Sequence, residues 1–249
     1  MTGAVGQHPR TILWDLDGTL VGLRKRTFKT VMPLTAALSF RDLTPPHRFL
    51  RILPGIMRQV RGNDTEHTNT DLMVELLARG LGVPAEIARL RLGRLTEVDF
   101  ARLRACFPAL PAAVATVADL RAAGVAQVVA TNPLWPLASA TTRLGWGGHD
   151  PADFDFITSG ETMRRSKPRV EFYHELLERL AVEPRQCVMI GNDAANDAPA
   201  ARAGIPVFLI GAAKSAVPEE CSRTGLVSTG NWPRLREWLG IEERSCSSS

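Results

Sequence analysis

The fold is decided by the stretch TILWDLDGTL, residues 11–20. The run TILWDLD within it predicts a short buried strand that ends in acidic residues. Asp15 and Asp17 follow at the end of this strand, and extended geometry points two carboxylates two residues apart the same way. Gly18 then lets the chain turn sharply. One carboxylate of such a pair is able to attack a substrate while the other moves protons, although an ordinary Asp-rich turn carries the same residues.

The second half of the chain alternates short apolar runs with helical patterns. Such alternation favours right-handed crossovers and a parallel sheet with helices on both faces. We therefore expect an α/β fold with strands at 126–130, 154–158, 187–190 and 207–210, and helices at 112–123, 170–180 and 194–203. The serine-rich end, residues 244–249, is expected to be frayed.

A long helical segment separates this half from the first strand. From Arg24 to about Cys106 the apolar residues recur at helical spacing, with turn signals between the periodic stretches. The segment therefore looks inserted shortly after the first strand. Because open α/β sheets bind ligands at the carboxyl ends of their strands, we expect this insertion to form a lid over those ends.

Three further segments carry polar groups at predicted strand ends or helix starts. Thr131 and Asn132 follow one strand, where a hydroxyl and exposed amides suit a phosphoryl oxygen. Lys167 precedes a helix and is placed to reach the sheet edge. Asp193 and Asp197 share a helix face, so their carboxylates repel each other unless a cation lies between them. Taken alone, each segment also has an ordinary interpretation as a turn, a solvated lysine or an N-cap.

The order of these segments is more specific than any one of them. A strand with DxDGT, a strand with Thr, a Lys before a helix and a strand with GND and a further Asp resemble the four-motif signature of the haloacid dehalogenase (HAD) superfamily. The segments TNPLWP, SKPRVEFYHELLERL and VMIGNDAANDAPAARAGIPVFLI are also similar to a bacterial subgroup known only as HAD family hydrolases. The resemblance implies a Rossmannoid core of residues 1–20 and 107–249, with an inserted helical domain of the C1 type at residues 21–106, called the cap below.

The resemblance also implies a catalytic role for each motif. Asp15 matches the nucleophile that forms an aspartyl-phosphate, which splits one displacement into two easier steps. Asp17 matches the general acid that protonates the leaving oxygen and then activates water as a base. Thr131, with the neighbouring Asn132, matches the group that binds the phosphoryl oxygens. Lys167 matches the cation that offsets charge on the nucleophile and on the phosphoryl group, and so it also contacts the substrate.

A Mg²⁺ ion belongs to the same resemblance. Asp15, the backbone carbonyl of Asp17 and Asp193 match the protein ligands of the metal. Asp197 matches the second acid of the fourth motif, which holds either Lys167 or a metal-bound water. Phosphoryl transfer needs mainly positioning and charge neutralisation, and these residues supply both.

Two residues depart from the usual pattern. Many relatives carry Gly-Asp where this chain has Gly191-Asn192, which leaves open whether Asn192 or Asp193 is the metal ligand. We favour Asp193, because it lies the common four residues before Asp197. Trp14 stands where Phe is more usual, and we expect a core substitution without consequence.

Within the superfamily the motifs favour hydrolysis of a small phosphomonoester. Dehalogenases lack the second carboxylate of the first motif, so Asp17 disfavours dehalogenation. Phosphonate hydrolysis needs a cap lysine, and the cap offers only Lys25 and Lys29 near its junction with the core. A phosphomutase acting on sugar phosphates would share all four motifs and stays an alternative. A catalytically idle binding or regulatory protein is the other alternative, although such a protein has no physical reason to keep both carboxylates.

Composition and charge indicate which classes of substrate and partner the protein binds. The 249 residues carry a net charge of +4 and are 45% hydrophobic, which excludes a largely disordered chain. The cap holds fifteen Lys and Arg against eight Asp and Glu, a balance of +7, whereas the rest of the chain balances at −3. A basic cap would steer small anionic substrates into the cleft. Residues 24–26 and the group Arg58, Arg61 and His67 are candidate anion clamps or ordinary solvated side chains.

Other partners and compartments are disfavoured. Aromatic residues make up only 6% and no nucleic-acid-binding motif is present, so we expect no nucleic-acid partner. The most apolar stretch, 111–140, is broken by charged residues and prolines, which argues against a membrane span. The N-terminal stretch lacks a targeting pattern and the four cysteines are dispersed, which favours a cytoplasmic protein with reduced thiols. The sequence leaves the substrate and the oligomeric state open.

Overall fold

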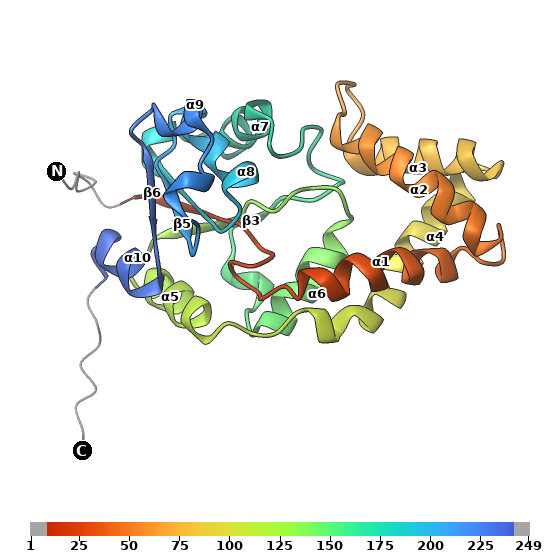
Figure 1. Cartoon of the computed structure of the whole chain (residues 1–249), viewed down its shortest axis with the longest axis horizontal. Helices are drawn as coiled ribbons and strands as arrows, with labels where there is room; N and C mark the ends of the chain where they lie inside the picture. Colours follow the sequence, from red (N-terminus) through yellow and green to blue (C-terminus); the bar gives the residue numbers. More distant parts are fainter. Residues whose placement is uncertain (1–8, 242–249) are drawn as a thin grey trace, which may run out of the picture.

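Six parallel strands form the centre of the computed structural model, which describes residues 9–241 (Figure 1). The strands are β1 (Thr11–Trp14), β2 (Ala126–Val129), β3 (Phe156–Ile157), β4 (Cys187–Gly191), β5 (Val207–Ile210) and β6 (Val227–Gly230). Their order across the sheet is β3-β2-β1-β4-β5-β6, so the carboxyl end of β1 lies between β2 and β4. The expected α/β fold with a parallel sheet is confirmed.

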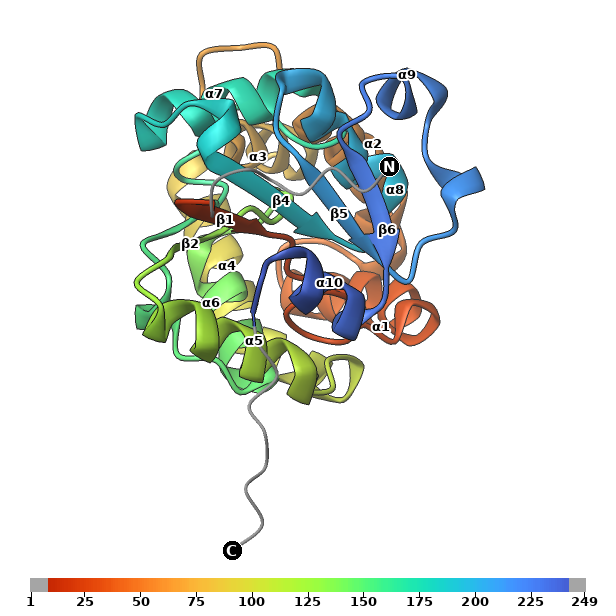
Figure 2. The same ribbon diagram turned by 90° about the vertical axis from the view of Figure 1, so that its left-hand side faces the viewer.

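Helices cover both faces of this sheet, as Figure 2 shows. One face carries α5 (Pro111–Ala122), α6 (Leu137–Gly147) and α10 (Trp232–Trp238), and the other carries α7 (Val170–Leu180), α8 (Ala194–Asp197) and α9 (Glu219–Ser222). Successive strand residues point to opposite faces. Ile12 and Trp14 therefore join the buried cluster that contains Leu120 of α5, whereas Leu13 joins the cluster that contains Phe172 of α7.

The chain between β1 and β2 is helical and extends away from the sheet (Figure 1). It contains α1 (Lys25–Ser39), α2 (Pro46–Arg61), α3 (Asn69–Leu81), α4 (Ala85–Glu97) and the 3₁₀ helix η1 (Asp99–Cys106). The two connections to the core run side by side, because Gly22 N donates to Pro108 O at 2.8 Å and Arg24 N donates to Cys106 O at 2.8 Å. The insertion therefore leaves and re-enters the core at one place, next to the end of β1.

Trp14 is accommodated by a specific polar partner. Its indole nitrogen Nε1 donates to Gln127 Oε1 at 2.9 Å, and both side chains are buried. Gln127 lies on the neighbouring strand β2, and its Nε2 donates in turn to the carbonyl of Val117 at 3.0 Å. A buried indole N–H needs such an acceptor. The Trp that stands in place of the more usual Phe therefore has a buried glutamine as its hydrogen-bond partner.

Several elements differ from those expected, and the helices α6, α9 and α10 are not predicted by the sequence pattern. The strand β6, with the weakly apolar sequence VSTG, is not predicted by the pattern, and β3 is shorter than the expected 154–158. The predicted helix 194–203 is divided into α8 and the 3₁₀ helix η4 (Ala198–Ala203), because Pro199 lacks an N–H to continue the α-helical pattern. The remaining 3₁₀ helices are η2 (Pro151–Asp153), η3 (Pro184–Gln186) and η5 (Lys214–Ala216).

Two expectations bear on the chain as a whole. Within residues 9–241, every helix is too short or too polar to cross a bilayer. The serine-rich end at 244–249 lies outside the described residues, so its expected fraying stays a prediction.

Candidate active site

The loop that follows β1 packs directly against the loop that follows β4. Gly18 has φ +97°, and a Cβ on it would lie 2.3 Å from Asn192 Nδ2, so only glycine fits here. The buried Thr19 donates from Oγ1 to Asn192 Oδ1 at 3.3 Å. Asp15 N donates to Ile190 O at 2.8 Å, which continues the pairing of β1 with β4 past the strand end. The first and fourth motifs thus form one surface.

Lys167 connects two carboxylates at the centre of this surface. Its side chain is 1% exposed, and Nζ lies 3.0 Å from Asp15 Oδ1 and 2.7 Å from Asp197 Oδ1. Burial raises the pKa of Asp15 to about 7, even though the charge of Lys167 acts in the opposite direction. Burial also opposes the charge on Lys167, but Asp15 and Asp197 raise its pKa above the ordinary value. The lysine therefore stays cationic beside the carboxylate that the sequence predicts as nucleophile.

Asp197 has both carboxylate oxygens engaged by the protein. Oδ1 accepts from Lys167, and Oδ2 accepts from the backbone N–H groups of Asn192 at 3.1 Å and Asp193 at 3.0 Å. Gly191 makes room for this contact, since a Cβ at that position would lie 2.1 Å from Asp197 Oδ2. Of the two roles that the sequence leaves for Asp197, holding Lys167 is the one that its contacts show.

Asp193 caps α8 and still presents one oxygen to the cleft. Its Oδ1 accepts from Ala195 N at 3.1 Å and from Asn196 N at 3.3 Å, as expected of an N-cap. Its Oδ2 lies 4.0 Å from Nζ of Lys25, at the start of α1 in the cap. Asn192 and Asp193 both line the same cavity, so the fold brings both candidate ligands to the floor of the site.

The second motif lies on the opposite side of the floor. Thr131 is buried and its carbonyl accepts from Thr158 Oγ1 at 2.7 Å. Asn132 Nδ2 donates to the carbonyl of Lys167 at 3.4 Å, which ties this loop to the third motif. Its Oδ1 is buried without a hydrogen-bond partner in the described part of the chain. Both side chains line the cavity, so polar groups of all four motifs meet there.

Arg143 belongs to this site although the sequence analysis passes over it. It lies on α6, is 5% exposed, and donates from Nη1 to Asp17 Oδ2 and from Nε to the carbonyl of Ser139 at 2.9 Å. The other oxygen, Asp17 Oδ1, is buried without a hydrogen-bond partner among residues 9–241. The sequence holds one signal for Arg143, a single charge in the small and apolar helix LASATTRLGWG. A buried arginine of this kind usually requires a partner.

A cavity of about 620 Å³ lies between the motifs and the cap. The floor supplies Asp15, Asp17, Gly18, Thr131, Asn132, Arg143, Lys167, Asn192, Asp193 and Asn196, with Leu134 and Trp135 beside them. The cap supplies Leu23, Lys25, Phe28, Lys29, Met32, Pro33, Leu53, Met57, Arg61 and Phe100. Of the basic residues considered as anion clamps, Lys25 and Arg61 line the cavity, whereas Arg24, Arg26, Arg58 and His67 lie outside the lining.

Most of the basic side chains of the cap lie outside the lining of the cavity. Several arginines pair with acids of the cap itself, including Arg79 with Glu75 and Arg89 with Asp71. Such exposed pairs are screened by solvent and say little about the substrate. The charge balance of +7 is thus spread over the cap surface, and only three of its cations, Lys25, Lys29 and Arg61, face the cavity.

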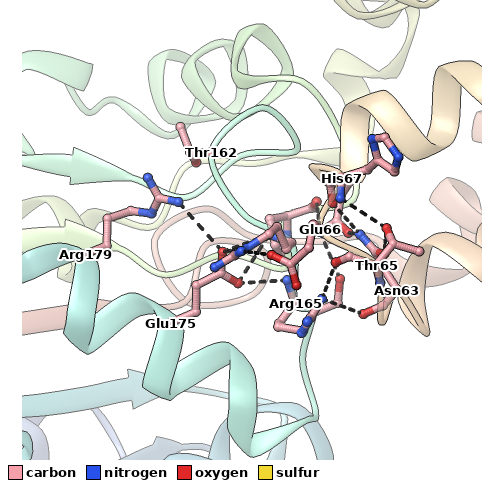
Figure 3. Close-up of polar contacts among 12 residues, drawn as sticks. Asn63, Thr65, Glu66, His67, Thr162, Arg165, Glu175 and Arg179 are labelled. Carbon is pink, nitrogen blue, oxygen red and sulfur yellow. Dashed lines mark hydrogen bonds and ion pairs between the residues drawn. The ribbon is translucent and has the colours of Figure 1, made fainter.

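The cap also contacts the core through a polar surface away from its chain connections. Asn69, fully buried at the start of α3, donates from Nδ2 to the carbonyl of Pro133 at 3.1 Å and to Ser166 Oγ at 3.3 Å. Arg165 reaches the loop 62–68 of the cap and donates to two of its carbonyls, at 2.8 and 3.2 Å (Figure 3). The cap is thereby bound to the loops of the second and third motifs.

Glu175 of α7 fixes the segment that precedes Lys167. Its carboxylate accepts from the backbone N–H of Arg164 at 3.0 Å and of Arg165 at 2.8 Å, and it lies 3.7 Å from Nη2 of Arg179 (Figure 3). The side chain is buried, so these contacts exclude solvent. The position of Lys167 is therefore set from both sides, by Glu175 before it and by the carboxylates in front of it.

The donor atoms on the floor suit a hard divalent cation. They are oxygens of Asp15, Asp17 and Asp193 and the amide oxygen of Asn192, and Asp17 Oδ1 is buried without a partner. Within residues 9–241, no three His, Cys, Asp or Glu side chains are grouped closely enough to share one metal. Mg²⁺ does not require such a group, because it is usually held by one or two carboxylates together with waters and substrate phosphate.

Comparison with known proteins shows the family to which this arrangement belongs. The family model described as haloacid dehalogenase-like hydrolase matches residues 9–204. The chain is 28% identical to a phosphoglycolate phosphatase of Rhodospirillum rubrum, covering 94% of this chain and 92% of that protein. It is 30% identical to a phosphoglycolate phosphatase of Caulobacter vibrioides, covering 87% and 85%. Among solved structures, a 2-haloacid dehalogenase of Pseudomonas syringae pv. tomato has a TM-score of 0.60 at 21% identity, covering 93% and 98%, which shows a shared fold.

Proposed function

The chain belongs to the haloacid dehalogenase-like hydrolases, and we propose that it is a Mg²⁺-dependent phosphatase that cleaves a small phosphomonoester through an aspartyl-phosphate on Asp15. One observation carries the proposal. The two carboxylates of the first motif face one cavity, yet each has its own buried cation, Lys167 for Asp15 and Arg143 for Asp17. Two carboxylates in different environments suit two different roles, nucleophile and proton carrier.

In the first step Asp15 attacks phosphorus. A bond forms between a carboxylate oxygen of Asp15 and the phosphorus atom, while the bond between phosphorus and the ester oxygen breaks. Asp17 delivers a proton to the departing oxygen, so that the product leaves as an alcohol. The monoanion of the substrate brings this proton, since the second pKa of a phosphomonoester is about 6.

In the second step water attacks the phosphorylated Asp15. Asp17, now a carboxylate paired with Arg143, takes a proton from the water, and inorganic phosphate leaves. Lys167 offsets negative charge on Asp15 and on the phosphoryl oxygens in both steps. Thr131 and Asn132 orient those oxygens from the opposite side of the floor. Neither step changes an oxidation state, so no oxidant or reductant is required.

The metal belongs to the same proposal. Asp15, the carbonyl of Asp17 and Asp193 would hold Mg²⁺, and among residues 9–241 only Oδ1 of Asp193 accepts hydrogen bonds, which leaves Oδ2 for the metal. When bound, the ion neutralises charge on the phosphoryl oxygens. We include in the proposal the division of the chain into a core, residues 1–20 and 107–249, and the cap at residues 21–106.

Two other activities would use the same residues. A phosphomutase would return the phosphoryl group from Asp15 to a sugar hydroxyl instead of water. A binding protein without turnover would leave the partners of Asp15 and Asp17 without a purpose, because buried charges are costly to keep. Neither has an observation in its favour that hydrolysis lacks.

The test is release of phosphate from p-nitrophenyl phosphate by the purified full chain, with Mg²⁺ and again with a chelator. We expect release with Mg²⁺, loss of release with the chelator, and loss of release in Asp15→Asn. Equal activity of wild type and Asp15→Asn would reject Asp15 as nucleophile. Interconversion of sugar phosphates with little free phosphate would identify the phosphomutase, and absence of turnover across a broad panel of phosphate esters would reject the enzyme.

A further inference from the structure

The cap wall of the cavity is an apolar stripe at helical spacing. Phe28 and Met32 are four residues apart on α1, and Leu53 and Met57 are four residues apart on α2, so each pair lies on one face of its helix. All four line the cavity above the catalytic floor. The two helices therefore turn apolar faces toward the place where a substrate would extend from its phosphate.

This stripe is distinct from the interior of the cap. The cap has its own packed centre, in which Phe40 and Phe49 are 0% and 1% exposed and their rings lie 4.7 Å apart. By contrast, Phe28, Leu53 and Met57 remain half-buried, and the surface they leave uncovered faces the cavity. A contiguous apolar surface that stays uncovered and is bordered by polar residues is typical of a ligand-binding groove. The remaining apolar surface is available to a ligand.

The core continues the same wall down to the phosphate site. Leu134 and Trp135 follow Asn132 and Pro133 in the chain, and both line the cavity together with Asn132. Trp135 is half-buried, and it contributes to the same apolar cluster as Leu53 and Met57. An apolar surface thus begins beside the phosphoryl-binding residues and runs onto α1 and α2. A group attached to the phosphate through its ester oxygen would meet this surface first.

The cations that the cap contributes to the cavity do not supply a buried site for a second anion. Lys25 lies 4.0 Å from Asp193, so its charge is partly committed to the floor. Lys29 and Arg61 are exposed, and solvent screens exposed charges. A carboxylate removed from water needs a close, desolvated partner, and none of these three offers one. They are better suited to steering an anion toward the cavity.

The volume of the cavity also favours a substrate with a large apolar group. A cavity of about 620 Å³ lies within the range of about 300–1,000 Å³ that encloses drug-sized ligands. A phosphate that carries only a two-carbon acid would occupy the floor and leave the apolar wall against water. Pockets of this size, with apolar walls and a few polar groups, bury most of the surface of a drug-sized ligand against the apolar walls, while the polar groups orient it.

We infer that the substrate is a phosphomonoester of a bulky, largely apolar alcohol, whose hydrocarbon part lies against Phe28, Leu53, Met57 and Trp135. This inference rests on the proposed phosphatase function. It differs from the substrate in the names of the two curated relatives, since phosphoglycolate carries a carboxylate in place of an apolar group.

The test is a ladder of n-alkyl phosphates from ethyl to octyl, compared with 2-phosphoglycolate at one Mg²⁺ concentration. We expect kcat/KM to rise by about two- to fourfold for each methylene until the cavity is filled, as burial of hydrocarbon predicts. Octyl phosphate should then exceed 2-phosphoglycolate by more than about tenfold. A flat ladder, or preference for 2-phosphoglycolate, would overturn this inference and leave the phosphatase intact.

Two matched variants locate the effect in the cap wall. Met57→Gln places an amide on the cavity wall, whereas Leu34→Gln makes a similar change at an exposed position of α1 outside the lining. Met57→Gln should lower kcat/KM for octyl phosphate about tenfold more than for ethyl phosphate, because only the longer chain reaches the wall. Leu34→Gln should change neither. If Met57→Gln and Leu34→Gln changed kcat/KM for octyl phosphate to the same extent, the hydrocarbon part of the substrate would not bind against the cap wall.

Binding separates this inference from the proposed function. If no phosphate ester is hydrolysed, the phosphatase proposal fails, and calorimetry with inert phosphonates still tests the cavity. We expect octylphosphonate to bind at least about tenfold more tightly than methylphosphonate, and Met57→Gln to remove the difference. Equal affinities of the two phosphonates would overturn the inference on its own.

Discussion

Arg143 donates through Nη1 to the Asp17 carboxylate and is itself enclosed by aromatic rings. Its guanidinium carbon lies 5.9 Å from the ring centres of both Phe100 and Phe107, and Phe100 comes from the cap. The core thus supplies the arginine and the cap helps to cover it. Because Nε is also fixed by the carbonyl of Ser139, the side chain has little freedom to let Asp17 move.

Arg143→Met should therefore impair proton delivery more than substrate binding. We expect kcat for alkyl phosphates to fall by about ten- to a hundredfold with little change in KM, since general acid catalysis contributes about 10²–10⁴-fold. Release of p-nitrophenol should suffer less, because that leaving group needs no protonation. The measurement is kcat and KM for both substrate types.

A matched arginine serves as the control for this prediction. Arg104 lies over the ring of Trp146 at 5.7 Å, in the same aromatic region, but outside the cavity lining. Arg104→Met should leave the dependence on the leaving group unchanged. If Arg143→Met slowed both substrate types equally, a role for Arg143 in proton delivery to the leaving oxygen would be excluded.

Asp197→Asn should destabilise the protein, because Lys167 would lose a carboxylate that is 0% exposed. Breaking one partner of a buried ion pair costs about 3–5 kcal/mol of unfolding free energy. Urea unfolding in the presence of a chelator measures this without stabilisation by bound metal. Asp193→Asn is the control, since Asn and Asp cap helices about equally well and the expected loss is below about 0.5 kcal/mol. Similar losses in both variants would show that the Lys167 pair does not stabilise the fold.

The sequence predicts the residues of the site that stand next to strand ends. Asp15, Asp17 and Thr131 are placed by the strands that precede them, and the Lys167 and Asp197 contacts follow once the parallel sheet brings those ends together. Local geometry predicts only that these residues lie at strand ends or helix starts, and their roles follow from the resemblance of the four motifs taken together. The same reasoning leaves the choice between Asn192 and Asp193 open, because both reach the cavity floor.

What the sequence does not predict depends on long-range packing. Arg143 is 126 positions from Asp17, and only the fold of α6 against the loop after β1 brings the two together. The charge balance of the cap likewise does not tell which side chains face inward, so it predicts a basic lid where the cavity wall is largely apolar. The strand β6 is missed because its VSTG sequence pairs only at the edge of the sheet, beside β5.

Asn69→Ala should loosen the contact between cap and core. The variant leaves the carbonyl of Pro133 and the hydroxyl of Ser166 without their buried donor, which costs about 1–3 kcal/mol of unfolding free energy. Hydrogen exchange of residues 160–169 should become faster, and these peptides are measured by mass spectrometry. Arg169→Ala breaks a more exposed ion pair with Asp64 and should cost less than about 1 kcal/mol. Unchanged exchange in Asn69→Ala would mean that this contact does not hold the cap.

His149 should make the stability of the protein dependent on pH. Burial lowers the pKa of its imidazole below the ordinary value of 6.5, despite the contact of 3.0 Å between Nε2 and the carbonyl of Leu20. As the pH falls below that ordinary value, the unfolded chain takes up a proton that the folded chain resists, so the free energy of unfolding decreases. Above about pH 6.5 both states carry a neutral imidazole and the effect disappears.

The measurement is the urea midpoint between pH 5 and pH 8 for wild type, His149→Gln and His47→Gln. His149→Gln should be less stable at pH 8 and should lose part of the decrease toward pH 5, because no buried imidazole remains to resist protonation. His47 is exposed, so its replacement should keep the full decrease. A steeper decrease in His149→Gln than in wild type would contradict a depressed pKa, because it would mean that the folded state holds the proton more tightly than the unfolded chain.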